Sequence, residues 1–373
     1  MELDKELSGI LVVSLEQAVA APYCGLLLAS AGARVIKVER PEGDFARSYD
    51  TGADGDSAIF AWLNRGKESI ALNLKDTKDK KVLEKILKKS DVFLSNLAPG
   101  SLDKLGLNRT QLNSINPTII TCEITGYGTK KDALTRKAYD FLVQAESGLC
   151  SVTGTEDNPS KVGISVTDLS TGLTSFSAIL RALIQRSKSH KGIHLSISMF
   201  DVIADWMNMP LLAHRYMGGT PKRSGLKHTF IAPYGAFKCS DGKQILISVQ
   251  NNREFEVFCE KILDNKHLSK NPKFSDNPQR YRNRIELDGI ITESFLKITK
   301  HQIQRKLDRV GIANAELNTV ENLSHHKFLR NESAKFSIAS LSVAALPVIT
   351  KSGTPKKVPQ LNENGESIRS EFT

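Results

Sequence analysis

Residues 10 to 39 read Ile10-Leu-Val-Val-Ser-Leu-Glu-Gln-Ala-Val-Ala-Ala-Pro-Tyr-Cys-Gly-Leu-Leu-Leu-Ala-Ser-Ala-Gly-Ala-Arg-Val-Ile-Lys-Val-Glu39, and this stretch decides the fold class. The runs 10–15 and 34–39 are short and apolar, as buried strands are. Between them, 22–32 reads as an apolar helix with proline in its first turn. A strand, a helix and a strand in this order predict a right-handed βαβ unit whose strands are parallel.

The same alternation continues along the first half of the chain. Further strands are predicted at 69–74, 91–95, 118–123 and 194–198, with helices at 78–89, after Asp168 and at about 200–216. Strands that alternate with helices indicate an α/β fold, here a Rossmann-like, doubly wound parallel sheet. The GxGxxG turn of dinucleotide-binding folds is absent after the first strand, so the sequence does not predict NAD binding.

A second style of sequence follows. Residues 236–249 read as a hairpin with Asp241-Gly242 in the turn, and helices are predicted near 253–263, 284–297 and 301–310. We therefore predict a smaller α+β domain at 225–325. It is inserted into a large domain formed by 1–220, to which 330–373 returns.

The composition excludes several classes of protein. The 373 residues are 40% hydrophobic and 25% charged, and the net charge of +10 is spread along predicted helices without interleaved aromatic residues, so a nucleic-acid partner is not expected. The five cysteines are scattered and form no CxxC pair, which argues against disulfides and a zinc site. No signal peptide or membrane span is predicted, and we expect a cytoplasmic protein that does not bind membranes.

Three stretches carry a family resemblance. They are Ala138-Tyr-Asp-Phe-Leu-Val-Gln-Ala-Glu-Ser-Gly148, Val162-Gly-Ile-Ser-Val-Thr-Asp-Leu-Ser-Thr-Gly172 and the N-terminal Leu15-Glu-Gln-Ala-Val-Ala-Ala-Pro22. Together they resemble the class III CoA-transferases (the CaiB/BaiF family, which includes formyl-CoA transferase), from about Gly9 to Lys327. The stretches 205–210, 215–221 and 231–235 resemble the branch that acts on C4–C5 dicarboxylates such as succinate, itaconate or mesaconate.

The resemblance implies an activity and an assembly. It implies transfer of CoA between an acyl-CoA and a carboxylic acid through an aspartyl intermediate, with CoA as a substrate and no tightly bound cofactor or metal. It also implies an interlocked homodimer.

Asp168 matches the family's nucleophilic aspartate. A carboxylate can attack a thioester carbonyl, and a helix N-terminus should help to keep it ionised. From position alone, however, an aspartate before an amphipathic helix is more often an N-cap. Capping is therefore the competing interpretation of Asp168.

The resemblance also implies binding residues. The positions that match the CoA site are Arg40, Leu72, Lys75, Asn96, Lys104, Lys137 and Tyr139, and a ligand with phosphates needs converging cations of this kind. For a second carboxylate on the acceptor the candidates are Arg47 and His228, with Arg215 and Arg223 in the same group of cations. Any of these could instead be a surface group or a dimer contact.

Two departures keep alternatives open. Acyl-CoA racemases share the fold and carry a His-Asp pair where this chain has Tyr139-Asp140, so an acid/base histidine is missing and racemisation is disfavoured. The family's Gly-rich loop is absent, and the ending Gly365-Glu-Ser-Ile-Arg369 departs from Gly-Glu-His. A CoA-binding protein with impaired catalysis is therefore the alternative from another class.

Overall fold

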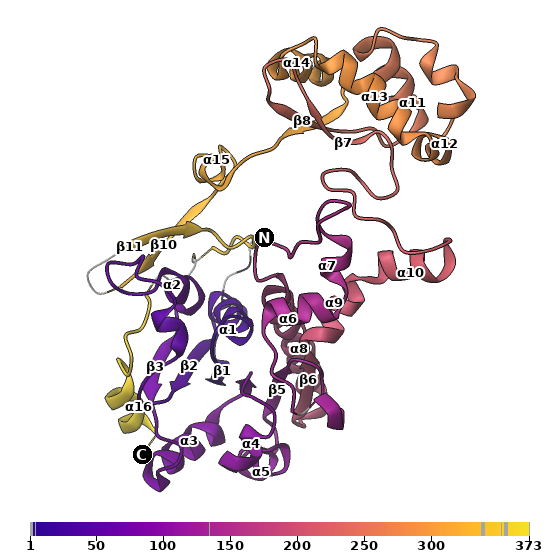
Figure 1. Cartoon of the computed structure of the whole chain (residues 1–373). Coiled ribbons are helices and arrows are strands. Elements are labelled where there is room, and N and C mark those ends of the chain that lie inside the picture. The colour runs from indigo at the N-terminus through magenta and orange to yellow at the C-terminus, as the bar shows by residue number, and fades with distance from the viewer. Residues whose placement is uncertain are drawn as a thin grey trace. The chain divides into compact units, whose positions relative to one another are not determined.

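Six parallel strands form the sheet of the first of two units into which the chain divides (Figure 1). The computed structural model describes residues 3, 5–133, 135–336, 340–351, 353 and 357–372. Unit 1 comprises Met1–Cys150, Lys161–Leu211 and Arg330–Thr373, and unit 2 comprises Ser151–Ser160 and Leu212–Leu329.

The segment Ser151–Ser160 belongs to unit 2, whereas the sequence analysis places it in the large domain. The reason is a set of hydrogen bonds within unit 2. Gly225 N donates to Gly154 O, and the Arg223 guanidinium donates to Thr155 O and Glu156 O.

The sheet has the order β3-β2-β1-β4-β5-β6, and every neighbouring pair is parallel. Its strands are β1 (Leu11–Leu15), β2 (Arg34–Glu39), β3 (Glu68–Ala71), β4 (Val92–Ser95), β5 (Ile120–Thr125) and β6 (Ile193–Ser198). The predicted doubly wound parallel sheet is confirmed. Strand β3 is shorter than predicted because its pairing with β2 ends at Glu39.

The helices of this unit lie on both faces of the sheet. They are α1 (Ala20–Ser30), α2 (Ala58–Asn64), α3 (Thr77–Lys89), α4 (Ser101–Leu105), α5 (Arg109–Ile115), α6 (Asp140–Glu146), α8 (Val166–Ser189), α9 (Met199–Trp206) and α16 (Gly365–Glu371). Two more, α7 (Leu149–Val152) and α10 (Asn208–Tyr216), cross the boundary between the units. The helix expected over 200–216 is thus divided into α9 and α10.

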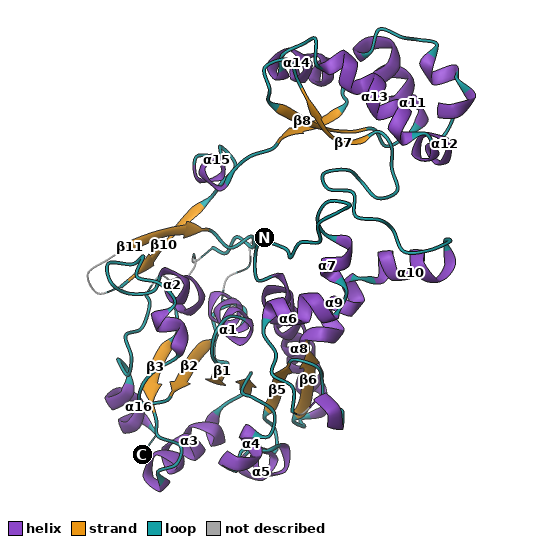
Figure 2. Cartoon of the chain, in the orientation of Figure 1, coloured by secondary structure: helices purple, strands orange, loops and turns teal. Residues whose placement is uncertain are grey.

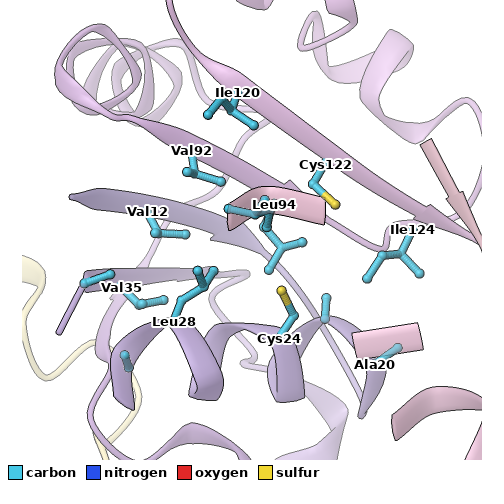
Figure 3. Packing of buried hydrophobic residues seen from close by; sticks show 14 of the residues in the cluster. Val12, Ala20, Cys24, Leu28, Val35, Val92, Leu94, Ile120, Cys122 and Ile124 are labelled. Carbon is cyan, nitrogen blue, oxygen red and sulfur yellow. The ribbon is translucent and has the colours of Figure 1, made fainter. Parts of the chain in front are cut away.

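Alternate residues of each strand face opposite helical layers, as strand geometry requires. Val12 and Leu94 point toward α1, where Cys24 and Leu28 meet them (Figure 3). Val13 and its equivalents on the neighbouring strands pack instead against α3, α4, α5 and α16. Both faces of the sheet are therefore buried.

Helices α1 and α8 approach each other at Gly172. A Cβ atom at this position would lie 2.5 Å from Ala20 O and 3.1 Å from the Tyr23 ring. Only glycine fits here without a shift of the helix backbone. Asp168 stands one helical turn before this contact.

The C-terminal segment covers the open edge of β3. Asn364 accepts a hydrogen bond from Ser69 N, and Asn362 accepts one from Ala71 N, so these side chains satisfy edge groups that have no strand partner. Ser367, in the position of the family's histidine, lies in α16 and donates to Asn364 O. In the same unit, β10 (Asn331–Lys335) pairs antiparallel with β11 (Ser340–Ala344).

Unit 2 is α+β. Strands β7 (Tyr234–Lys238), β8 (Gln244–Ser248) and β9 (Ala313–Glu316) form an antiparallel sheet. Its helices are α11 (Asn252–Val257), continued by a π-helical turn at Phe258–Ile262, α12 (Asn277–Arg282), α13 (Arg284–Phe295), α14 (Lys300–Val310) and α15 (Val320–Ser324) (Figure 2). Gly242 turns the β7–β8 hairpin with φ +76°.

Among the described residues, the structure contains no helix with the length and apolar character needed to span a bilayer.

The glycine contact makes a testable prediction. Gly172→Ala should lower the free energy of unfolding of unit 1 by about 1–3 kcal/mol, because the added methyl group overpacks the α1–α8 contact. Urea unfolding followed by Trp62 and Trp206 fluorescence measures this, since both tryptophans lie in unit 1. Gly289→Ala in α13, where nothing lies within 4 Å of the added Cβ, is the control and should leave that transition unchanged. Equal stability of Gly172→Ala and wild type would contradict the packing argument.

Candidate active site

A pocket of about 530 Å³ opens at the carboxyl ends of the strands, where the strand order reverses between β1 and β4. Its lining consists of residues 15–17 at the end of β1, 38–44 at the end of β2, 72–75 after β3, Leu97 and Leu105. Ligands of open α/β sheets bind at such a switch point. The topology therefore places the candidate site here.

Three of the predicted CoA-site residues line this pocket: Arg40, Leu72 and Lys75. Leu72 is buried, while Arg40 and Lys75 are exposed. Arg40 donates from Nε to Gly43 O (2.9 Å), which orients its guanidinium at the pocket wall. Lys104 is an exposed neighbour of the lining residue Leu105.

Asn96 holds the loop between β1 and α1. Its Oδ1 accepts from Gln17 N (2.9 Å) and its Nδ2 donates to Gln17 O (2.8 Å). This amide pair fixes the backbone of a residue that lines the pocket. Asn96 is a predicted CoA contact, and in the structure its side chain holds the backbone of Gln17.

Asp168 lies inside the first turn of α8, three residues after the N-cap Ser165. The free N–H groups of this turn are occupied by another residue: Asp140 Oδ1 accepts from Thr167 N (2.8 Å) and Asp168 N (3.3 Å). Gln144 Nε2 in turn donates to Asp140 Oδ2 (2.7 Å). Asp140 therefore caps α8, and the Asp168 side chain does not act as its N-cap.

The Asp168 carboxylate receives no hydrogen bond from any described part of the chain. Burial, and after it the charge of Asp140, raise the pKa of Asp168 to about 7. The expectation that the helix N-terminus keeps Asp168 ionised is thus corrected. The N–H groups that would favour its charge bind Asp140 instead.

Tyr49 lies near both Asp168 and the pocket residue Asp44. Burial, then the charges of Asp44, Asp168 and Tyr139, raise the pKa of Tyr49 to about 12. Asp44 lines the pocket, so Asp168 and the predicted residue Tyr139 lie near the same hydroxyl as the pocket wall. Tyr139 is 62% exposed, and Lys137 is exposed two residues earlier.

Arg47 has structural partners. Its Nε and Nη2 donate to Glu39 (2.8 and 2.7 Å), its Nη1 donates to Pro359 O, and its guanidinium stacks 4.0 Å from the Phe60 ring centroid. Burial opposes ionisation of Glu39, yet hydrogen bonds from Arg47 together with the charge of Lys37 lower its pKa to about 2. This geometry favours the structural alternative for Arg47 over a substrate contact.

His228 lies in unit 2. Its ring stacks on Tyr234 with centroids 4.9 Å apart, and its Nδ1 accepts hydrogen bonds from Phe230 N and Ile231 N. Burial and the charge of Arg284 lower the pKa of His228, so it is neutral at pH 7 and is not a fixed cation. Of the two related cations, Arg223 is bound to backbone carbonyls and Arg215 is exposed on α10.

Several residues near the pocket escaped the sequence analysis. Lys37, Lys67, Glu16 and Asp44 form a buried ionic cluster, and Asp140 caps α8. Lys37 gave one signal, because a lysine inside the apolar strand 34–39 needs a buried partner. Lys67 gave none, since its partners are distant in sequence.

Comparisons with known proteins agree on a family. A profile of the family described as CoA-transferase family III (CoA_transf_3) matches residues 7–362. Human succinyl-CoA:glutarate CoA-transferase is 36% identical over 324 residues, which cover 86% of this chain and 73% of the relative. Succinyl-CoA:mesaconate CoA-transferase of Haloarcula marismortui is 31% identical over 297 residues, covering 77% and 74%.

A solved structure has the same fold. The crystal structure of a CaiB/BaiF family protein from Brucella suis superposes with a TM-score of 0.85 at 31% identity, covering 98% of this chain and 99% of that one.

The raised pKa of Asp168 makes a prediction about stability. A carboxyl group whose pKa is about 7 in the folded protein and 3.8 in the unfolded chain stabilises the fold at low pH. That contribution to the free energy of unfolding is lost as pH rises from about 4 to 7. Asp168→Asn removes this loss, so the free energy of unfolding should rise by roughly 4 kcal/mol above pH 7, the equivalent of about three pKa units, and by little at pH 4. Urea unfolding of both proteins at pH 4, 6 and 8 measures the difference.

Exposed Asp132 supplies the matched control, because Asp132→Asn should leave stability unchanged at all three pH values. A gain for Asp168→Asn that does not grow with pH would show that its carboxyl group is not held at a raised pKa.

Proposed function

This chain belongs to CoA-transferase family III and transfers CoA between an acyl-CoA and a carboxylic acid, and we propose that Asp168 performs the transfer through a covalent aspartyl intermediate. The observation that carries the proposal is the state of the Asp168 carboxylate. It is partly buried, receives no hydrogen bond from the described residues and has a pKa raised to about 7. A carboxylate with little solvation and no partner is a stronger nucleophile than one in water.

The proposed chemistry balances without a redox group or metal. The Asp168 carboxylate attacks the thioester carbonyl, the C–S bond breaks, and CoA thiolate leaves behind a mixed anhydride. The thiolate then attacks the aspartyl carbonyl, which releases the donor acid as a carboxylate and leaves an aspartyl-CoA thioester. The acceptor carboxylate reverses both steps, so that a new acyl-CoA forms and the Asp168 carboxylate is regenerated.

For CoA itself we propose the pocket at the carboxyl ends of the strands. Arg40 and Lys75 stand at its wall and Lys104 beside it, and these cations suit the phosphate groups. Leu72 lies in the pocket lining on the proposed adenine side, although its side chain is buried, and Tyr139 and Asp168 both lie near Tyr49. CoA enters and leaves as a substrate, so the proposal requires no tightly bound cofactor.

The proposed acceptor is a dicarboxylate of four or five carbons. The support comes from the relatives, whose names pair succinyl-CoA with glutarate and with mesaconate. Arg47 is bound to Glu39 and the pKa of His228 is lowered, so neither is a free cation within its own unit, and their assignment to the second carboxylate stays a prediction. The homodimer implied by the family resemblance stays a prediction.

The covalent step has a direct test. The protein incubated with succinyl-CoA and then quenched with hydroxylamine should carry a hydroxamate on the peptide that contains Asp168, because hydroxylamine attacks an aspartyl thioester or anhydride but not a carboxylate. Peptide mass spectrometry reads the modification.

Asp168→Asn should show no adduct and should lose at least about 10³-fold in kcat, the scale expected for a lost nucleophile. Asp132→Asn should match wild type in both measurements. A modified peptide other than that of Asp168 would reassign the nucleophile. Absence of any adduct together with normal CoA binding would favour the catalytically impaired alternative.

The acceptor class has its own test. With succinyl-CoA as donor, glutarate and mesaconate should exceed butyrate in kcat/KM by at least about tenfold, the effect of roughly 1.4 kcal/mol from one additional charged contact. Initial rates measured by separation of the acyl-CoA products give these ratios. Equal use of butyrate would remove the dicarboxylate part of the proposal and leave the aspartyl mechanism intact.

A further inference from the structure

Lys67 connects three elements from a completely buried position. Its side chain is 0% exposed, and its Nζ donates to Glu16 Oε1 (2.5 Å), Pro22 O (2.9 Å) and Asn64 Oδ1 (2.9 Å). Glu16 directly follows β1, Pro22 lies in the first turn of α1, and Asn64 ends α2. The three hydrogens of one ammonium group thus fix both ends of the loop between β1 and α1.

A second buried ammonium holds the same loop from β2. Lys37 Nζ donates to Glu16 O (3.2 Å) and to Asp44 Oδ2 (2.8 Å). Asp44 Oδ1 accepts in turn from Ala18 N (3.3 Å). Together with the Asn96 clamp on Gln17, these contacts hold successive backbone groups of the loop by side chains.

The loop needs such support because its backbone is strained. Ala18 has φ +62°, a left-handed conformation that residues other than glycine rarely adopt. Conformations of this kind persist only where the surrounding structure imposes them, and they cluster at functional sites.

Helix α1 leaves room for the ion pair of Glu16 and Lys67 at Gly25. A Cβ atom at Gly25 would lie 2.9 Å from Glu16 Oε2 and 3.0 Å from Lys67 Nζ, so glycine in the middle of this helix leaves the room that the two charged groups occupy. Glycine lowers helix stability, and a buried ion pair is often no better for stability than apolar residues of the same volume. Stability alone is therefore a weak reason for this arrangement.

The loop leads into the contact between α1 and α8, which lies one helical turn from the proposed nucleophile. Helix α8 contacts α1 at Ala20, two residues after Ala18, and Asp168 lies one turn before that contact on α8. Asp44, which binds Ala18 N, and Asp168 both act on the Tyr49 hydroxyl. Glu16 and Gln17 also line the pocket, so the ionic cluster holds a loop that forms part of the pocket wall and leads into the contact between α1 and α8.

We propose that Lys67, acting through Glu16, is a positioning residue for CoA transfer that fixes the Gln17–Ala18 loop in its reactive geometry beside Asp168. The inference rests on the proposed function of Asp168. Lys67 does not touch the substrate; it determines where the loop stands when the substrate binds.

The test separates this role from a purely structural one. The cluster of Glu16, Asp44, Lys37 and Lys67 has no net charge, and Lys67→Met combined with Glu16→Gln also leaves none. A merely structural ion pair predicts that this double variant recovers both stability and activity relative to Lys67→Met. The positioning role predicts that stability recovers while kcat stays about 10- to 100-fold below wild type, with an unchanged Kd for CoA.

Three further measurements complete the design. Glu16→Gln alone keeps the side-chain shape and an acceptor oxygen, so it tests the proposal even where Lys67→Met folds poorly; its kcat should fall about 3- to 10-fold at constant Kd for CoA. Lys85→Met, at an exposed position of α3, is the control and should match wild type. The hydroxylamine adduct on Asp168 should form more slowly in the double variant.

Wild-type kcat in the double variant and in Glu16→Gln would overturn the positioning role while the proposed function stands. A wild-type protein that transfers no CoA would overturn both.

Discussion

The close approach of α1 and α8 is the constraint on which the site depends. With no side chain at Gly172, the backbone of α8 comes within van der Waals reach of Ala20 O, and the start of α8 is brought beside the loop that follows β1. That loop lies at the carboxyl edge of the sheet, where the strand order reverses and a pocket opens. A bulkier contact would move the start of α8, and Asp168 with it, away from α1.

Charge is buried behind this loop in an ordered way. The cluster around Glu16 and Lys67 is neutral as a whole, and next to it Glu39 binds Arg47, which reaches the C-terminal segment at Pro359. Each ion is matched because an unpaired charge in such a place costs far more than a pair. These contacts hold the loop between β1 and α1 from its buried side.

Asp140, the first residue of α6, and Asp168, in the first turn of α8, show how one helix N-terminus gives different roles to two aspartates. Asp140 accepts hydrogen bonds from N–H groups of the first turn, while the Asp168 carboxylate accepts none from the described residues and has a pKa raised to about 7. A helix N-terminus favours an anion only where its N–H groups are free to bind it. Asp140 occupies them and adds repulsion, so the anionic form of Asp168 is destabilised.

The sequence by itself determined the βαβ order, the parallel sheet, the family and Asp168 as candidate nucleophile, because periodicity and motifs are local properties of the chain. The tertiary structure decided what each charged side chain does. Arg47 looked like a free loop cation, yet its partners Glu39 and Pro359 are 8 and 312 residues away. Lys67 gave no signal at all, since its carboxylate partner stands 51 residues earlier and becomes a neighbour only when β1 and α2 converge. Ion pairs and pKa shifts arise from burial and distance in space, and both quantities exist only after the chain has folded.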